Sequence, residues 1–148
     1  MIVGNGLIAN LFKNEDRENV VFFASGVSNS LETEKSVFLR EENLLRKHLT
    51  ENPEKIFIYF STCSIYDSSK NASLYVNHKL KMERLVEELA HKFVILRVSN
   101  AVGKGGNPNL LMNYLVNSVK EEKIINVHTL ATRNLIDADD IKNITLEL

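Results

Sequence analysis

Three side chains near the middle of the chain have the types and spacing of a proton-transfer site. Tyr75 and Lys79 are four residues apart, so both lie on one face of a predicted helix. An ammonium beside a phenol favours the phenolate, so we expect Lys79 to lower the pKa of Tyr75 and let it exchange a proton with a hydroxyl group. Thr62 follows a predicted buried strand, at the end where open α/β sheets bind their ligands. A half-buried tyrosine and a solvated lysine on an ordinary helix would show the same four-residue spacing.

The start of the chain carries a second pattern, that of a loop which binds phosphate. Gly4, Gly6 and Ala9 fit the G-x-G-x-x-G/A fingerprint, after a very short predicted strand and before a predicted helix. The first glycine permits a tight turn, the second lets the backbone approach a pyrophosphate, and the third, small residue lets the helix pack closely. The pyrophosphate would lie over Gly4, Gly6 and the N–H groups of Leu7 and Ile8. A glycine turn without a ligand fits the same residues, and the acidic residue usually found about 20 positions later for the adenine ribose is absent.

Apolar runs of strand length alternate with helical patterns along the chain. The predicted strands cover Ile2–Val3, Val20–Ala24, Ile56–Phe60, Phe93–Leu96 and Ile124–Val127. The predicted helices cover about 31–49 and 73–92, a segment around 111–119, and the C-terminal segment from Asp139. Three of the apolar runs are continuous, which is typical of parallel strands with helices on both faces. This order predicts an α/β fold, a Rossmann-type three-layer sandwich with a reduced, mostly parallel sheet of about five strands and right-handed crossovers.

Composition and charge argue against several other classes of protein. The 148 residues are 44% apolar and 25% charged, which suits one folded domain, predicted over 1–148. A net charge of −1 without a basic stripe argues against a nucleic-acid partner, and no apolar run has the length of a membrane span. The four scattered histidines predict no metal site. The single cysteine, Cys63, together with the lack of a signal-peptide pattern, indicates the cytoplasm, and we favour a packed Cys63 over a nucleophile that uses His78 as its base.

Together, these patterns resemble the extended short-chain dehydrogenase/reductase family, which includes the NAD-dependent nucleotide-sugar epimerases and dehydratases. The matching segments follow the family's order over nearly the whole chain. They are the glycine loop, the strand and small residues Val21–Ser25, the serine/threonine-rich strand end Ser61–Tyr66 with Thr62 at the catalytic position, the pair Tyr75 and Lys79, the segment Leu96–Gly103 that resembles L-R-x-x-N-x-x-G, and the segment Ala131–Ile141 that resembles R-D-F-I-x-V-x-D.

The resemblance implies an NAD(P)-dependent oxidoreductase of nucleotide-sugar metabolism and polysaccharide biosynthesis that acts on a sugar hydroxyl or keto group. It assigns catalysis to Thr62, Tyr75 and Lys79. It assigns the binding of NAD or NADP to Gly4, Gly6, Leu7, Ile8, Ala24, Ser25, Lys79 and Ser99. It assigns the binding of the nucleotide sugar to Asn100 and Arg133.

The chain departs from the family in four places. The family's second and third strands are missing, which removes the usual adenine-ribose site and leaves Ile2–Val3 at the edge of the sheet. The loop between Thr62 and Tyr75 is shorter than usual, and Arg133-Asn134 replaces the common Arg-Asp pair. The C-terminal substrate lobe is largely absent.

These departures leave three readings open: an active enzyme, a non-catalytic module that binds a dinucleotide or a sugar nucleotide, or a fragment of a longer protein. We also expect a homodimer through the helices at about 31–49 and 73–92. Their apolar residues Val37, Leu44, Met82 and Leu89 would face either the sheet or a second copy.

Overall fold

The structure, a computed structural model, describes residues 1–15, 17–108, 110–127, 129 and 132–148. Its main sheet has four parallel strands in the order of the sequence: β1 (Ile2–Val3), β2 (Val20–Phe23), β3 (Ile56–Thr62) and β4 (Lys92–Val98). In this sheet β1 pairs with β2 alone, so it forms the edge that the sequence predicts. Two short parallel strands, β5 (Asn100–Val102) and β6 (Leu135–Asp137), form a second, smaller sheet.

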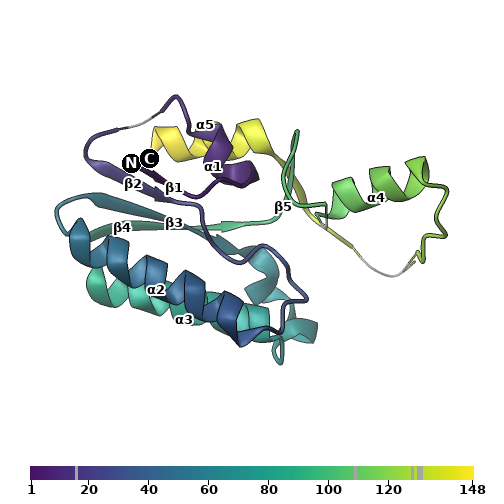
Figure 1. Cartoon of the computed structure of the whole chain (residues 1–148), viewed down its shortest axis with the longest axis horizontal. Coiled ribbons are helices and arrows are strands. Elements are labelled where there is room, and N and C mark those ends of the chain that lie inside the picture. Colours follow the sequence, from purple (N-terminus) through teal and green to yellow (C-terminus); the bar gives the residue numbers. More distant parts are fainter. Residues whose placement is uncertain (16, 109, 128, 130–131) are drawn as a thin grey trace.

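Helices cover both faces of the main sheet. They are α1 (Leu7–Leu11), α2 (Lys35–Glu51), α3 (Leu74–Leu89) and α5 (Ala138–Glu147), whereas α4 (Leu111–Lys120) stands apart from the main sheet (Figure 1). Figure 1 shows α2 and α3 side by side on one face of the sheet, and α1 with α5 on the other. The result is the predicted Rossmann-like three-layer sandwich. Two short 3-10 turns, η1 (Cys63–Tyr66) and η2 (Ser68–Lys70), lie between β3 and α3.

Successive residues of the central strands pack into two different cores. Val21 and Phe23 join a cluster with Met82 of α3, whereas Phe22 joins a cluster on the opposite face with Phe12. All four residues of β2 are buried. Burial on both faces explains why this strand is a continuous apolar run instead of an alternating one.

The β1–α1–β2 connection runs over the opposite face of the sheet from the next two connections. Strand order advances in one direction from β1 to β4. After α1, however, the ring of Phe12 stacks on Phe22, 4.6 Å between ring centres, on the face away from α2 and α3. When two connections each join neighbouring parallel strands in the same direction across a sheet but cross opposite faces of it, one connection is right-handed and the other is left-handed. The prediction of uniformly right-handed crossovers is therefore wrong for at least one connection, because the packing of Phe12 fixes α1 on that face.

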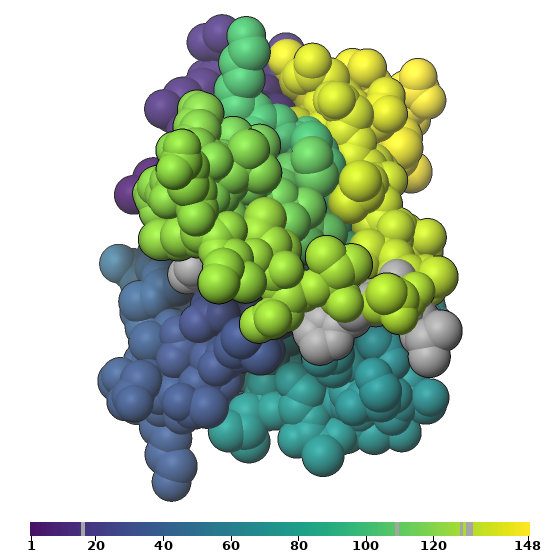
Figure 2. All heavy atoms as spheres, turned by 90° about the vertical axis from the view of Figure 1, so that its right-hand side faces the viewer, coloured from purple at the N-terminus to yellow at the C-terminus, as the bar shows by residue number. Residues whose placement is uncertain are grey.

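One predicted strand is wrong, and two short strands were not predicted. Residues 124–127 form no strand: Ile124 is 92% exposed and Val127 is 77% exposed, so neither has a sheet to pack on. The remaining strands are instead β5 and β6, three residues each. Figure 2 shows α4 and residues 121–127 on the face turned toward the viewer, between the α1–α5 layer and the α2–α3 layer. Within the described residues, no helix combines the length and the apolar character needed to cross a membrane.

Candidate functional site

Two loops meet at the carboxyl ends of β1 and β2. The N–H of Ala24 donates to the carbonyl of Val3 at 2.8 Å, and a Cβ at Gly4 would lie 2.5 Å from the carbonyl oxygen of Ala24. Gly4 has a φ of +129°, so glycine is required there both by conformation and by space. The loop after β1 leads to α1 on one face, and the loop after β2 leads to α2 on the other. Divergence of this kind between neighbouring strands opens the crevice in which α/β sheets bind ligands.

Most of the predicted cofactor residues lie in these two loops or at the start of α1, whereas Lys79 lies in α3 and Ser99 follows β4. Gly6 is exposed, and a Cβ added there would have no atom within 4 Å. Leu7 is buried and begins α1, whereas Ile8 is half-buried. Ser25 is hydrogen-bonded to Arg40, a residue that the sequence analysis did not predict for the site. Arg40 of α2 donates to the Ser25 hydroxyl at 3.2 Å and to its carbonyl at 3.0 Å.

Thr62 and Tyr75 come together at the carboxyl end of β3. The Thr62 hydroxyl accepts from the N–H of Ser64 at 3.1 Å, which caps η1. Tyr75 stands in the first turn of α3, which the Ser73 hydroxyl caps by accepting from the N–H of Val76. Burial raises the pKa of Tyr75, a hydrogen bond from Thr62 opposes that rise, and the charge of Glu41 adds to it. The expected lowering of this pKa by Lys79 is therefore wrong, because burial prevails and Lys79 is engaged elsewhere.

Lys79 is buried and bound to groups that are not on its own helix. Its ammonium donates to the carbonyl of Phe60 at 3.0 Å and to Oε1 of Glu41 at 3.3 Å. It also lies over the ring of Tyr59, 4.5 Å from the centre. Burial lowers the pKa of Lys79, and the carboxylate of Glu41 opposes that change.

Glu41 of α2 is the hub of this buried cluster, and the sequence reasoning missed it. Its side chain accepts from the N–H of Val27 at 2.6 Å and the hydroxyl of Tyr59 at 2.7 Å, and it bonds to Nε2 of His78 at 3.0 Å. Burial alone would raise the pKa of Glu41, but Lys79, His78 and these donors outweigh it and lower the pKa to about 2. A signal was available, since residue 41 falls at helical spacing within the apolar stripe of α2 and a charge there needs a buried partner.

A second buried carboxylate fixes the end of β3 to α3. Glu83 accepts from the hydroxyl of Ser61 at 2.5 Å and takes two hydrogen bonds from Arg97, at 2.7 and 3.2 Å. Arg97 also donates to the hydroxyl of Tyr66 at 2.6 Å. The Ser61–Tyr66 segment that holds Thr62 is thus anchored at both ends. Cys63 donates to the carbonyl of Arg97 at 2.9 Å while His78 is bound to Glu41, so the two do not pair.

The predicted substrate residues lie farther along the chain, on the smaller sheet. The side chain of Asn100, in β5, donates to the carbonyl of Asn134 at 3.0 Å, and Ser99 precedes it, half-buried. Arg133 is exposed, and its guanidinium donates to the carbonyl of Thr132 at 2.9 Å. The contacts described for Ser99, Asn100 and Arg133 do not connect them to Thr62, Tyr75 or Lys79. Ala131, which begins the matched segment, lies outside the described residues.

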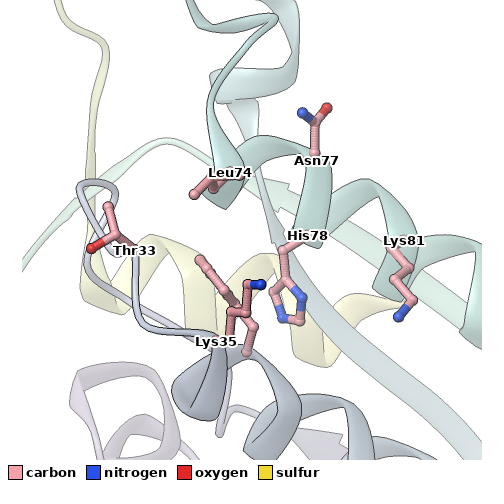
Figure 3. Close-up of a pocket in the computed structure, with 7 residues that line it drawn as sticks. Thr33, Lys35, Leu74, Asn77, His78 and Lys81 are labelled. Carbon is pink, nitrogen blue, oxygen red and sulfur yellow. The ribbon is translucent and has the colours of Figure 1, made fainter.

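A pocket of about 290 Å³ borders this cluster from the side of the helices. Its lining comes from the start of α2 and the first half of α3: Thr33, Lys35, Phe38, Leu74, Asn77, His78 and Lys81. Figure 3 shows the imidazole of His78 in the space between the two helices. The rings of His78 and Phe38 are 4.7 Å apart, and His78 connects the pocket wall to Glu41. None of the predicted site residues lines this pocket.

Comparisons with known proteins agree with this architecture. The crystal structure of UDP-glucuronic acid 4-epimerase from Bacillus cereus, in complex with UDP-glucuronic acid and NAD, matches 97% of this chain with a TM-score of 0.73 at 20% sequence identity. The capsular polysaccharide assembling protein CapF from Staphylococcus aureus matches 93% of it with a TM-score of 0.57 at 22% identity. The chain spans only 52% and 36% of those two chains. None of the curated proteins matches the sequence.

The family assignment rests on nearly the full length of the chain. The model of the family described as NAD dependent epimerase/dehydratase matches residues 4–147. The matched span contains the glycine loop, Thr62, Tyr75 and Lys79. The chain belongs to the NAD dependent epimerase/dehydratase family.

Proposed function

We propose that this chain binds NAD or NADP and catalyses hydride exchange at a hydroxyl or keto carbon of a nucleotide sugar. The observation that carries the proposal is the convergence of three side chains at the carboxyl end of β3: Thr62 lies near enough to Tyr75 to lower its pKa, and Lys79 follows on the next turn of the same helix face. Membership of an NAD-dependent family supports it, as do the ligands of the Bacillus cereus enzyme.

Two features of the glycine loop support a dinucleotide site. Gly4 brings the two backbones into contact, whereas the position of a Gly6 side chain is open space. A pyrophosphate there would meet the N–H groups that begin α1, which have no partner within the helix. Leu7, Ile8, Ala24 and Ser25 would form the walls, and Lys79 and Ser99 would hold the cofactor's ribose and nicotinamide side. A bound nicotinamide ring would supply the site that gives or takes the hydride.

Tyr75 and Thr62 would handle the proton. Since burial keeps the Tyr75 hydroxyl protonated at neutral pH, it is ready to donate to a keto oxygen as hydride reaches the adjacent carbon. The Thr62 hydroxyl would orient that oxygen, and Lys79 would stabilise the phenolate that remains after the proton leaves. In the reverse direction the phenolate would take the proton from the sugar hydroxyl. Asn100 and Arg133 would hold the nucleotide part of the substrate.

One pair of observations favours a second candidate, a non-catalytic module that binds a dinucleotide or a sugar nucleotide. Lys79 is bound to Glu41 instead of being free beside Tyr75, and β1 is an edge strand without the neighbours that usually carry the adenine ribose. Such a module would bind ligands through the same loops and show no turnover. The two candidates are separated by following the absorbance of the reduced cofactor while a panel of nucleotide sugars is added to the chain with its cofactor. A change in absorbance indicates the enzyme, and no change indicates the module.

The cofactor site is tested by calorimetric titration with NAD(H) and NADP(H). We expect binding weaker than is typical for the family, because the ribose carboxylate is missing. Gly6→Val should abolish binding without unfolding the chain, since its side chain would extend into the proposed pyrophosphate position and its Cβ would have no protein atom within 4 Å. Glu54→Val, at an exposed position beyond the end of α2, is the matched control and should bind as the wild type does. Failure of both nucleotides to bind at millimolar concentration would overturn the proposed enzyme, and unchanged binding by Gly6→Val would overturn the placement.

A further inference from the structure

We infer that Glu41 is a positioning residue, which holds the Lys79 ammonium in place and leaves one of its N–H groups for the cofactor ribose. The inference rests on the proposed function, because it assigns Lys79 to cofactor binding. It adds a residue on a different helix, joined to Lys79 across 38 positions of sequence.

Glu41 is built into the fold as an anion with a full set of partners. Its side chain has no solvent exposure, and its oxygens meet donors from three other segments: Val27 after β2, Tyr59 in β3, and His78 with Lys79 in α3. A buried carboxylate with four partners has a fixed orientation. A fixed carboxylate also fixes the groups that bind to it. The ammonium of Lys79 is one of these groups, and it is the only ammonium among the four partners.

Lys79 has little hydrogen-bonding capacity left. An ammonium has three N–H donors. The contacts of the described residues use two of them, on Phe60 and on Glu41, which leaves one. A Cβ at Gly26 would lie 2.8 Å from the Lys79 nitrogen and 3.0 Å from Oε1 of Glu41, so the loop after β2 closes directly on the pair. This loop follows Ala24 and Ser25, where the proposed cofactor passes.

Glu41 is also the group that keeps Lys79 charged. A buried ammonium tends to lose its proton unless an anion is near. The titratable groups that face Lys79 are Glu41 from α2, Tyr59 from β3 and Glu83 from α3. Tyr59 is held as a neutral phenol by burial, and Glu83 is occupied by Ser61 and Arg97. Of these groups, Glu41 is the carboxylate that hydrogen-bonds to the ammonium, so its removal should let Lys79 titrate at a lower pH.

The test compares Glu41→Gln with the same change at its neighbour, Glu42→Gln. The substituted glutamine keeps the size of the side chain and removes the charge. Glu42 pairs with Lys81 at 2.6 Å on the surface of the same two helices, so its variant controls for the loss of a charge there. The readouts are NADH affinity by calorimetry as a function of pH, and the titration of Lys79 followed by NMR of the protein with nitrogen-labelled lysine.

We expect NADH affinity in Glu41→Gln to fall at least tenfold at neutral pH and to recover as the pH is lowered and Lys79 regains its proton. The wild type and Glu42→Gln should bind with little pH dependence over the same range. A loss of affinity that does not depend on pH would show a merely structural role, and an unchanged titration of Lys79 would overturn the inference outright.

Two further outcomes keep the inference separate from the proposed function. If the wild type binds no NADH but Lys79 titrates lower in Glu41→Gln, the proposed function fails and the link between Glu41 and Lys79 stands. If Glu41→Gln does not fold, Gly26→Ala replaces it, because the added Cβ displaces the pair without removing a charge. That variant should also weaken NADH binding, and normal affinity and an unshifted Lys79 signal would overturn the inference.

Discussion

At the scale of single residues, the site depends on buried polar groups that hold one another. Burial raises the pKa of Tyr75, and the buried ammonium of Lys79 is hydrogen-bonded to Glu41. The sequence pointed to Thr62, Tyr75 and Lys79 through spacing and family resemblance. It did not point to Glu41 or Glu83, because a charged residue in a helix is read as exposed until its partners on other segments are known. Those partners, His78 and Arg97, lie 37 and 14 positions away in sequence.

The Tyr75 hydroxyl should be required for turnover and not for cofactor binding. Tyr75→Phe removes the proton that would be transferred and keeps the ring, so we expect activity on nucleotide sugars to be lost while NAD(H) affinity stays within about twofold of the wild type. Tyr114→Phe is the control, since that residue lies on α4, away from Thr62 and Lys79, and is 46% exposed. Steady-state rates and calorimetry measure the two effects. Full activity of Tyr75→Phe would show that another group carries the proton.

At the scale of elements, the long apolar segments were predictable and the short polar ones were not. β2, β3 and β4 lie within a few residues of their predicted positions, because burial on both faces gives continuous apolar runs. β5 and β6 were missed because three residues such as Asn100–Val102 give no periodicity. The run Ile124–Val127 was misassigned for the opposite reason: it is apolar, but no neighbouring strand pairs with it among the described residues.

The last helix depends on a cap that joins it to the smaller sheet. Asp137 ends β6, and its carboxylate accepts from the N–H of Asp139 at 2.8 Å, at the start of α5. Asp137→Ala should lower the free energy of unfolding by about 1 kcal/mol, because it leaves that N–H without its acceptor. Asp139→Ala, which removes only a favourable charge near the helix start, should cost roughly half as much or less. Urea unfolding of both variants measures the two losses of free energy of unfolding. Equal losses would show that Asp137 contributes no more than the favourable negative charge that Asp139 also provides near the helix start.

At the scale of the whole molecule, Glu41 makes stability depend on pH. Its pKa is about 2 in the folded chain against 4.5 for the ordinary group, so it stabilises the fold above about pH 4.5, and this contribution is lost as the pH falls toward 2. The contribution is on the order of 3 kcal/mol. Urea midpoints measured between about pH 6 and about pH 3 should fall less steeply for Glu41→Gln than for the wild type. A slope equal to that of Glu42→Gln would contradict this.

The apolar stripes of α2 and α3 face mainly the sheet, which limits what remains for assembly. Met82 is fully buried in the core and Leu44 packs against it, whereas Leu89 is 40% exposed. The apolar surface left on these helices includes Leu39 and Leu74, 55% and 56% exposed, and Leu74 lines the pocket of Figure 3. The expected homodimer would therefore use the region around this pocket instead of the stripe.

Light scattering tests the dimer. We expect about twice the chain mass of 16.8 kDa for the wild type and a monomer for Leu74→Glu, which places a charge in the contact. Val116→Glu, at a 45% exposed position on α4, is the control and should stay dimeric. A wild-type monomer at high micromolar concentration would rule the homodimer out.

The face on which α1 lies determines how the sheet could be lengthened. The open side of β1 has no neighbouring strand among the described residues, and α1 is fixed on its face by Phe12. The segment 13–19, between α1 and β2, contains no regular element in its described part. A pair of strands inserted into that segment would have the open side of β1 available for pairing. A carboxylate for the adenine ribose could thus be supplied by insertion at a single point, with the existing loops left in place.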